Sequence, residues 1–210
     1  MHHPDLRRVL SVVGLSQATP VREAVGLLWG ARPDLADAEA LEGLTVDPAV
    51  TVRRAAARAW AAARRFDRLG AMLGDPDPGV RQEIAVAFLD APDTAALEPL
   101  FLDPDEMVRA ALFATRLLRG EWSETPASFV ISRSAAATAI RQAQPVETLR
   151  EVARDDRDPA RRLPAALALA VLGDDAAYTV MRADPQWAIR DRVGRMLAGW
   201  REPPDTRHTA

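Results

Sequence analysis

The sequence has no cysteine and no lysine, and its three histidines, His2, His3 and His208, lie close to its ends. Without cysteine, disulfides, thiolate zinc sites and thiol catalysis are excluded. Without an internal histidine, Ser/His/Asp and Cys/His arrangements lack their base, and metal patterns that need histidines at helical spacing cannot form. We therefore expect a protein that is not an enzyme, with no catalytic residue, no metal site and no cofactor.

Long apolar runs and phosphate-binding loops are also missing. No segment approaches the roughly 20 apolar residues that a transmembrane helix needs. The opening stretch MHHPDLRRVLSVVGL lacks the apolar core and the cleavage site of a secretory signal. The 11 glycines are scattered, and none of them builds a P-loop or a dinucleotide fingerprint. These absences predict a cytoplasmic protein with no membrane partner.

Aromatic residues make up only 5% of the chain, whereas 48% of its residues are hydrophobic and alanine is frequent. Small apolar side chains favour closely packed helices over a β-sandwich, which would need more Val, Ile, Thr and aromatic residues. All 27 basic residues are arginine, which we interpret as the result of a GC-rich coding sequence. The net charge of −3 argues against a general nucleic-acid binder.

One short pattern recurs along the chain. Asp-Pro pairs begin similar segments at Asp47, Asp75, Asp103, Asp158 and Asp184. The first three start 28 residues apart, and each has Val five and Arg six positions after the Asp. A weaker copy from Ser16 keeps Val21 and Arg22, and we expect a degenerate copy between Ser128 and Ile140. Such a period accommodates two short helices and two tight turns, which is typical of a helical solenoid.

Each copy also has the chemistry of a helix start. Asp is a good N-cap, and Pro is favoured at the first helical position because its missing N–H would be unpaired there. The predicted helix then places Val52, Ala56 and Trp60 on one face. Shorter apolar segments, such as APDTAALEPLFLD before Asp103, precede the Asp-Pro pairs, and we expect them to form the partner helices.

The segment DPDPGVRQEIA, together with the A-x-x-x-L segment before it, resembles the short HEAT-like repeat of phycobilin lyases and many bacterial adaptor proteins. The resemblance implies an all-α, right-handed superhelical solenoid of about six or seven repeats, with the Asp-Pro-led helices on the concave face. The repeats are expected to start near residues 16, 47, 75, 103, 128, 158 and 184, within a solenoid over 16–200. A capping helix over 1–15 and a flexible tail over 201–210 would flank it.

The resemblance also implies a ladder of hydrogen bonds between the Asp and the Arg of successive repeats. Asp47, Asp75 and Asp103 with Arg53, Arg81 and Arg109 match this pattern, as do Asp184 and Arg190. We expect Pro164 to break the ladder at Asp158, where it stands at the Arg position. These residues are therefore interpreted as structural.

If the family geometry holds, the positions two, three and six after the repeated aliphatic residue face the concave groove. The partner-binding residues predicted in this way are Glu23, Leu27, Arg54, Arg58, Gln82, Glu83, Val86, Ala110, Ala114, Leu169, Arg192 and Arg195. Small apolar residues in the middle of this set and charged residues at its ends suit a peptide or an amphipathic helix. Alternatively, the small residues only permit tight curvature.

The hypothesis from the sequence is a non-enzymatic scaffold or adaptor that binds a protein or peptide partner on its concave face. The sequence does not define its oligomeric state, and we favour a monomer. The alternative is a nucleic-acid-binding protein of the HEAT-like DNA glycosylase type, which would need a continuous basic groove. A chromophore- or lipid-modifying lyase role follows from family analogy alone. Trp122 and Trp187 are expected to be partly exposed, either as partner anchors or as covers for irregular repeats.

Overall fold

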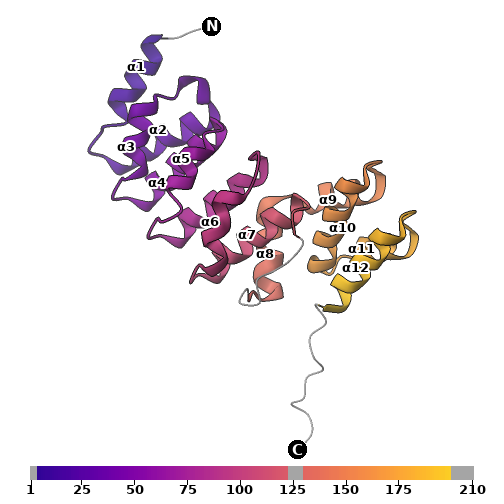
Figure 1. Cartoon of the computed structure of the whole chain (residues 1–210). Coiled ribbons are helices and arrows are strands. Elements are labelled where there is room, and N and C mark those ends of the chain that lie inside the picture. The colour runs from indigo at the N-terminus through magenta and orange to yellow at the C-terminus, as the bar shows by residue number, and fades with distance from the viewer. Residues whose placement is uncertain (1–3, 123–129, 200–210) are drawn as a thin grey trace, which may run out of the picture. The chain divides into compact units, whose positions relative to one another are not determined.

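The computed structural model describes residues 4–122 and 130–199, and every regular element within them is helical (Figure 1). The prediction of an all-α protein is therefore confirmed for this part of the chain. The predicted tail over 201–210 and the beginning of the degenerate repeat at Ser128 lie outside the described residues. None of the described helices is long and apolar enough to cross a membrane.

The chain forms two compact units, Met1–Leu112 and Phe113–Ala210, and the division falls within α7, which runs over Glu106–Leu118. The first unit, indigo to magenta in Figure 1, contains α1 Pro4–Val13, α2 Thr19–Ala31, η1 Pro33–Leu35, α3 Ala38–Thr45, α4 Val50–Ala62, α5 Phe66–Ala71, α6 Pro78–Ala87, η2 Phe88–Asp90 and η3 Ala95–Leu102. The second unit contains α8 Arg133–Ala143, α9 Val146–Asp155, α10 Pro159–Leu172, α11 Asp175–Ala183 and α12 Trp187–Gly199.

Both units are built from two layers of helices. In the first unit, α4 packs between α2 and α6, while α3 and α5 pack against α4 from the second layer. In the second unit, α10 packs between α8 and α12, and α9 and α11 form the other layer. Within each unit, helices that follow Asp-Pro pairs thus pack against each other, α4 against α6 in the first and α10 against α12 in the second.

The repeated apolar positions form the core. Val52, Val80 and Val108, five positions after their Asp, have no exposed surface. Trp60 of α4 and Phe88, the first residue of η2, lie eight positions after Val52 and Val80 and are also buried. In these two repeats, one valine and one large aromatic side chain therefore recur at the same positions of the core.

Close packing between α2 and α4 depends on a glycine. A Cβ atom added to Gly26 would lie 2.8 Å from the Cβ of Ala55, closer than real Cβ atoms approach. Glycine is unfavourable within a helix, so its presence at this position reflects the short distance between the two helices.

The helix starts differ from the prediction in one respect. Asp158 is an N-cap followed by proline, as expected. In the repeat that begins at Asp75, the N-cap is Asp77, which proline also follows. The carboxylates of Asp47 and Asp75 instead accept the backbone N–H two residues on, and their helices begin later. These two aspartates therefore form Asx turns that lead into the helix, rather than capping it.

The partner segment before Asp103 forms η3, a 3₁₀-helix, instead of the α-helix that its apolar spacing suggests. Pro99 lies inside this element and has no N–H to donate to a carbonyl one turn earlier. At the N-terminus, α1 packs on α2 through the buried Leu10, and Arg7 donates to the carbonyl of Ala36.

Candidate functional site

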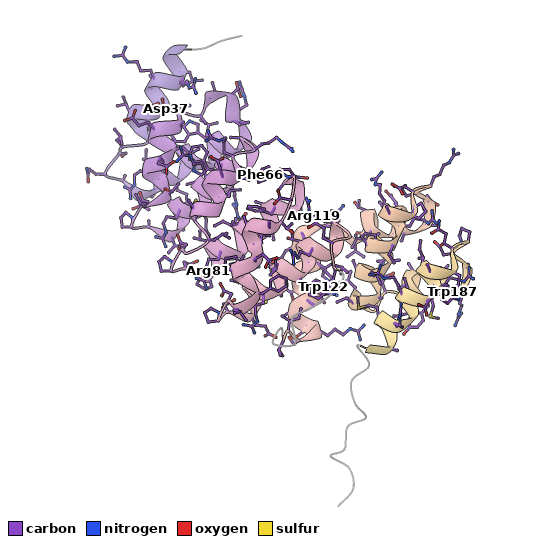
Figure 2. All side chains as sticks on the ribbon, viewed as in Figure 1. Asp37, Phe66, Arg81, Arg119, Trp122 and Trp187 are labelled. Atoms are coloured by element: carbon purple, nitrogen blue, oxygen red, sulfur yellow. The ribbon has the colours of Figure 1, made fainter. Side chains whose placement is uncertain are left out.

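Arginine–aspartate pairs join consecutive helices of the Asp-Pro-led layer. The Nε and Nη2 atoms of Arg53 donate to the two carboxylate oxygens of Asp75 at 2.7 and 2.9 Å. The Nη1 atom of Arg53 meanwhile donates to the carbonyl of Asp47 in the turn before its own helix. Equivalent carboxylate pairs are Arg22–Asp47, Arg81–Asp103 (Arg81 is labelled in Figure 2) and Arg162–Asp184.

The ladder that the resemblance implies is confirmed for Arg53 and Arg81, but the predicted break at Pro164 is wrong. Arg162 takes the ladder position, because its turn begins at Asp156 rather than at Asp158. Asp156 and Arg162 are six residues apart, as are Asp47 and Arg53. The Asp-Pro pair at Asp158 instead supplies the N-cap of α10, so the sequence pattern places this repeat two residues late.

The ladder is structural. Its aspartates are almost fully buried, and each carboxylate meets a guanidinium fork and a backbone N–H. The hydrogen bond from Arg22 holds the pKa of Asp47 below its usual range, against the effect of burial. Because the charges are paired with good geometry, they are not available to an outside ligand.

On the predicted partner face, the first unit presents charged residues that are already paired. Arg54 on α4 donates to Asp77 at 3.1 Å, and Arg58 donates to both carboxylate oxygens of Glu83 on α6. The hydrogen bond with Glu83 raises the pKa of Arg58. These pairs neutralise the two groove arginines predicted in this unit.

The other predicted residues of the first unit are accessible to different degrees. Leu27 on α2 is 43% exposed, while Glu23, Gln82 and Val86 are half-buried. The face formed by α2, α4 and α6 therefore combines one exposed leucine with ion pairs. A surface of this kind offers apolar contact without excess positive charge.

Three predicted contact residues are fully buried. Ala110, Ala114 and Leu169 have no exposed surface, and a side chain without exposed surface cannot touch a partner. The prediction is wrong for these three residues. They lie on α7 and α10, helices that the pattern analysis treats as having one exposed face, whereas their alanine-rich sequences are buried on several sides.

The second unit contains an open cleft of about 640 Å³ on the predicted face. It is lined by Trp122, Leu167 of α10, and Arg192, Arg195 and Met196 of α12. Leu167 and Met196 provide apolar surface, and the two arginines bring positive charge. Both predicted arginines of this unit thus line one cleft.

Trp122 (Figure 2) is held in place at this cleft by contacts on two sides. Its ring packs edge-on against Phe113, with 4.5 Å between the ring centroids, and its carbonyl accepts a hydrogen bond from Arg192 at 3.3 Å. The side chain is half-buried, which agrees with the expected partial exposure. Sequence reasoning identified Trp122 and the arginines separately, but it missed Leu167 and Met196, because the pattern gave no sign that they share a cleft with Trp122.

The arginines of the cleft differ in their partners. Arg195 forms an ion pair with Asp191 one turn earlier on α12, at 2.8 Å, and its side chain is 72% exposed. Arg192 is exposed, and the acceptor of its hydrogen bond is the neutral carbonyl of Trp122. Within residues 4–122 and 130–199, no ion pair joins Arg192 to a carboxylate, so this arginine brings positive charge to the cleft.

Two further clefts lie beside ladder pairs, one in each unit. One is lined by residues that include Asp47, Arg53 and Asp75, and the other by residues that include Asp156, Arg162 and Asp184. Because the same place in the repeat produces both, we interpret these clefts as a result of helix stacking. The described residues contain no cluster of three His, Cys, Asp or Glu that could hold a metal ion.

No protein-family model matches the chain, and no curated protein matches it in sequence. Among solved structures, the chain is similar to one described as the crystal structure of an engineered protein. That similarity has 18% sequence identity and a TM-score of 0.43, and it covers 94% of this chain and 97% of the other. At this TM-score the likeness carries no argument about fold family or function.

Proposed function

We propose that the protein is a non-enzymatic scaffold or adaptor that binds a protein or peptide partner. The helix pairs then belong to one right-handed solenoid of HEAT-like repeats, with the Asp-Pro-led layer on the concave side. The observation that carries this proposal is the cleft of Trp122, Leu167, Met196, Arg192 and Arg195. A half-buried tryptophan beside apolar side chains and arginine is the composition of protein-binding hot spots.

The chemistry of the cleft indicates what kind of segment fits it. Leu167 and Met196 favour an apolar side chain, and the exposed guanidinium of Arg192 favours a carboxylate close to it. In the first unit, the exposed Leu27 of α2 also offers apolar contact. The proposed partner is therefore a peptide or helix that alternates apolar and acidic residues.

The alternative function is nucleic-acid binding of the HEAT-like glycosylase type. Trp122 beside two arginines is an arrangement that can stack and neutralise a nucleotide. The ion pairs of Arg54 and Arg58 weigh against it, because a groove that follows a phosphate backbone needs cations that are not already matched by carboxylates.

The test compares two charge reversals of similar exposure. Arg192→Glu combined with Arg195→Glu changes the cleft. The control, Arg154→Glu on α9, changes a side chain that is also 72% exposed and also paired with a nearby aspartate, Asp155. Proteins that co-purify with the tagged wild type are identified by mass spectrometry and then measured against purified variants by titration. We expect the cleft variant to lose the interaction and the control to keep it.

The same proteins are titrated with single-stranded and duplex DNA at low salt. Affinity that falls steeply as salt rises, and that the cleft variant lacks, would establish the nucleic-acid function instead. A partner whose affinity is equal for all three proteins would show that the cleft is not the binding surface.

A further inference from the structure

The guanidinium of each paired ladder arginine donates hydrogen bonds in two directions. Nη1 donates to carbonyl groups of the turn before its own helix, and Nε with Nη2 donate to the aspartate of the following repeat. In Arg81 the second set of bonds is 2.7 and 2.8 Å long, to Asp103. The first set orients the side chain, and the second presents a flat fork to one carboxylate.

Arg190 on α12 has the first half of this arrangement. Its Nη1 donates to the carbonyl of Asp184, six residues earlier, as the Nη1 of Arg162 does to Asp156. Among residues 4–122 and 130–199, none accepts a hydrogen bond from its Nε or Nη2. The side chain is half-buried, and its hydrogen bond to the turn orients it. Its Nε–Nη2 edge is therefore positioned to bind a carboxylate, but no carboxylate of the described residues meets it.

We propose that the Nε–Nη2 edge of Arg190 is a docking point for an aspartate or glutamate of a partner protein. The partner supplies to Arg190 the kind of carboxylate that Asp184 supplies to Arg162. This site is separate from the Trp122 cleft, so the outcome of its test does not depend on the test of the proposed function. Because the bond to Asp184 already orients the guanidinium, a carboxylate meets a preorganised fork and less ordering opposes binding.

An aromatic side chain accompanies the fork. Trp187 is 69% exposed and precedes Arg190 by three positions on α12, a spacing that places both on the same side of the helix. Figure 2 shows Trp187 at the outer edge of the second unit. The site therefore fits an acidic residue with an apolar neighbour, as in the turn of residues 72–81, where Asp75 follows Met72 and Leu73.

A second copy of the chain does not supply this carboxylate through its first repeat. Ser16 occupies the position of the ladder aspartate there, and its hydroxyl accepts the N–H of Ala18, as the carboxylate of Asp47 accepts that of Ala49. A hydroxyl cannot receive both arms of the fork. The ladder register therefore favours a different protein as the source of the acid.

The test uses the acetylated and amidated peptide of residues 72–81 as the probe, and the same peptide with Asp75→Asn as its control. The full-length protein, labelled with ¹⁵N-arginine, is titrated while the Nε–H signals are followed by NMR. We expect the Arg190 signal to move with saturation, and the Asn peptide to leave it in place. Arg190→Lys removes the fork and should weaken binding by about tenfold or more, whereas Arg182→Lys on α11 should not change it.

Three outcomes would overturn the proposal: no movement of the Arg190 signal at millimolar peptide, equal movement with the Asn peptide, or unchanged affinity in Arg190→Lys. A fourth arm examines the chain's own Glu202 and Asp205. If the Arg190 signal of the full chain already resembles those of Arg53 and Arg81, and loses this resemblance when residues 200–210 are removed, the tail fills the fork and the docking point for a partner does not exist.

Discussion

Arg162 and Asp184 form the same two-armed ion pair as Arg53 and Asp75, and in both cases the two residues are 22 positions apart. The pair at Arg162 is almost fully buried, with side-chain exposures of 9% and 3%. Helix-to-helix spacing is therefore fixed by the same contact in both units, even where the surrounding sequence no longer shows the pattern.

Removal of one ladder partner is predicted to be strongly destabilising. Asp75→Ala leaves the guanidinium of Arg53 without its carboxylate in a nearly buried position, and the expected loss is about 3 kcal/mol of unfolding free energy. Urea denaturation followed by circular dichroism measures it. The matched control is Asp34→Ala, which breaks an exposed pair with Arg32 and should cost less than about 1 kcal/mol. Equal effects would show that burial does not matter to the ladder.

Acid is predicted to weaken the first unit through Asp47. Its folded pKa is depressed, chiefly by the hydrogen bond from Arg22, below the value of about 3.9 expected in the unfolded chain. The stability from this group is therefore fully present above the unfolded pKa and is lost as pH falls through the folded pKa.

Urea midpoints measured from pH 7 to pH 2 test this dependence. The wild type should be flat above about pH 5 and should decline below about pH 4. Asp47→Asn has no charge to lose at this position, so it should be less stable at neutral pH and should decline less steeply. If the urea midpoints of the two proteins fell in parallel with pH, the acid dependence would not come from Asp47.

Two glycines in neighbouring helices are predicted to respond oppositely to alanine. Gly26→Ala forces a Cβ atom to within 2.8 Å of Ala55 and should destabilise the protein by about 1–3 kcal/mol through overpacking. Gly43→Ala on α3 meets no atom within 4 Å and should stabilise by about 0.5–1 kcal/mol through helix propensity. Thermal unfolding of both variants gives the comparison, and stabilisation by Gly26→Ala would show that α2 and α4 are farther apart than described.

A charge swap tests the ion pair on the predicted partner face. Arg58→Glu places a second carboxylate beside Glu83 and should lower stability by less than about 1 kcal/mol, because both side chains are partly exposed. Adding Glu83→Arg to Arg58→Glu should restore the wild-type urea midpoint. Failure of this restoration would mean that the residues do not interact across α4 and α6.

Residues that follow the 28-residue spacing can be predicted from the sequence, whereas residues that depart from this spacing cannot. Val52, Val80 and the ladder residues Arg53 and Arg81 follow one spacing, so one copy explains the others. At Asp158 the spacing changes by two residues, and only the position of Arg162 in space shows which aspartate begins the turn. Asp-Pro is an ambiguous signal, because it marks an Asx turn at Asp75 and an N-cap at Asp158.

The candidate site was less predictable than the fold. Periodicity identifies which residues share a helix face, but it does not show how deeply that face is buried in the fold. Ala110 and Leu169 occupy predicted face positions and are nevertheless fully buried. The cleft also depends on Trp122, which lies outside the repeat pattern and meets residues of α10 and α12 only in three dimensions.

The shared 22-residue clamp between an arginine and the next aspartate has an evolutionary consequence. Between Asp47 and Asp103, duplication of one whole 28-residue segment places an aspartate 22 residues after each arginine of the ladder, whereas an insertion of a few residues inside a segment does not. In this part of the chain, whole repeats can therefore be gained while the arginine–aspartate ion pairs between consecutive repeats are kept.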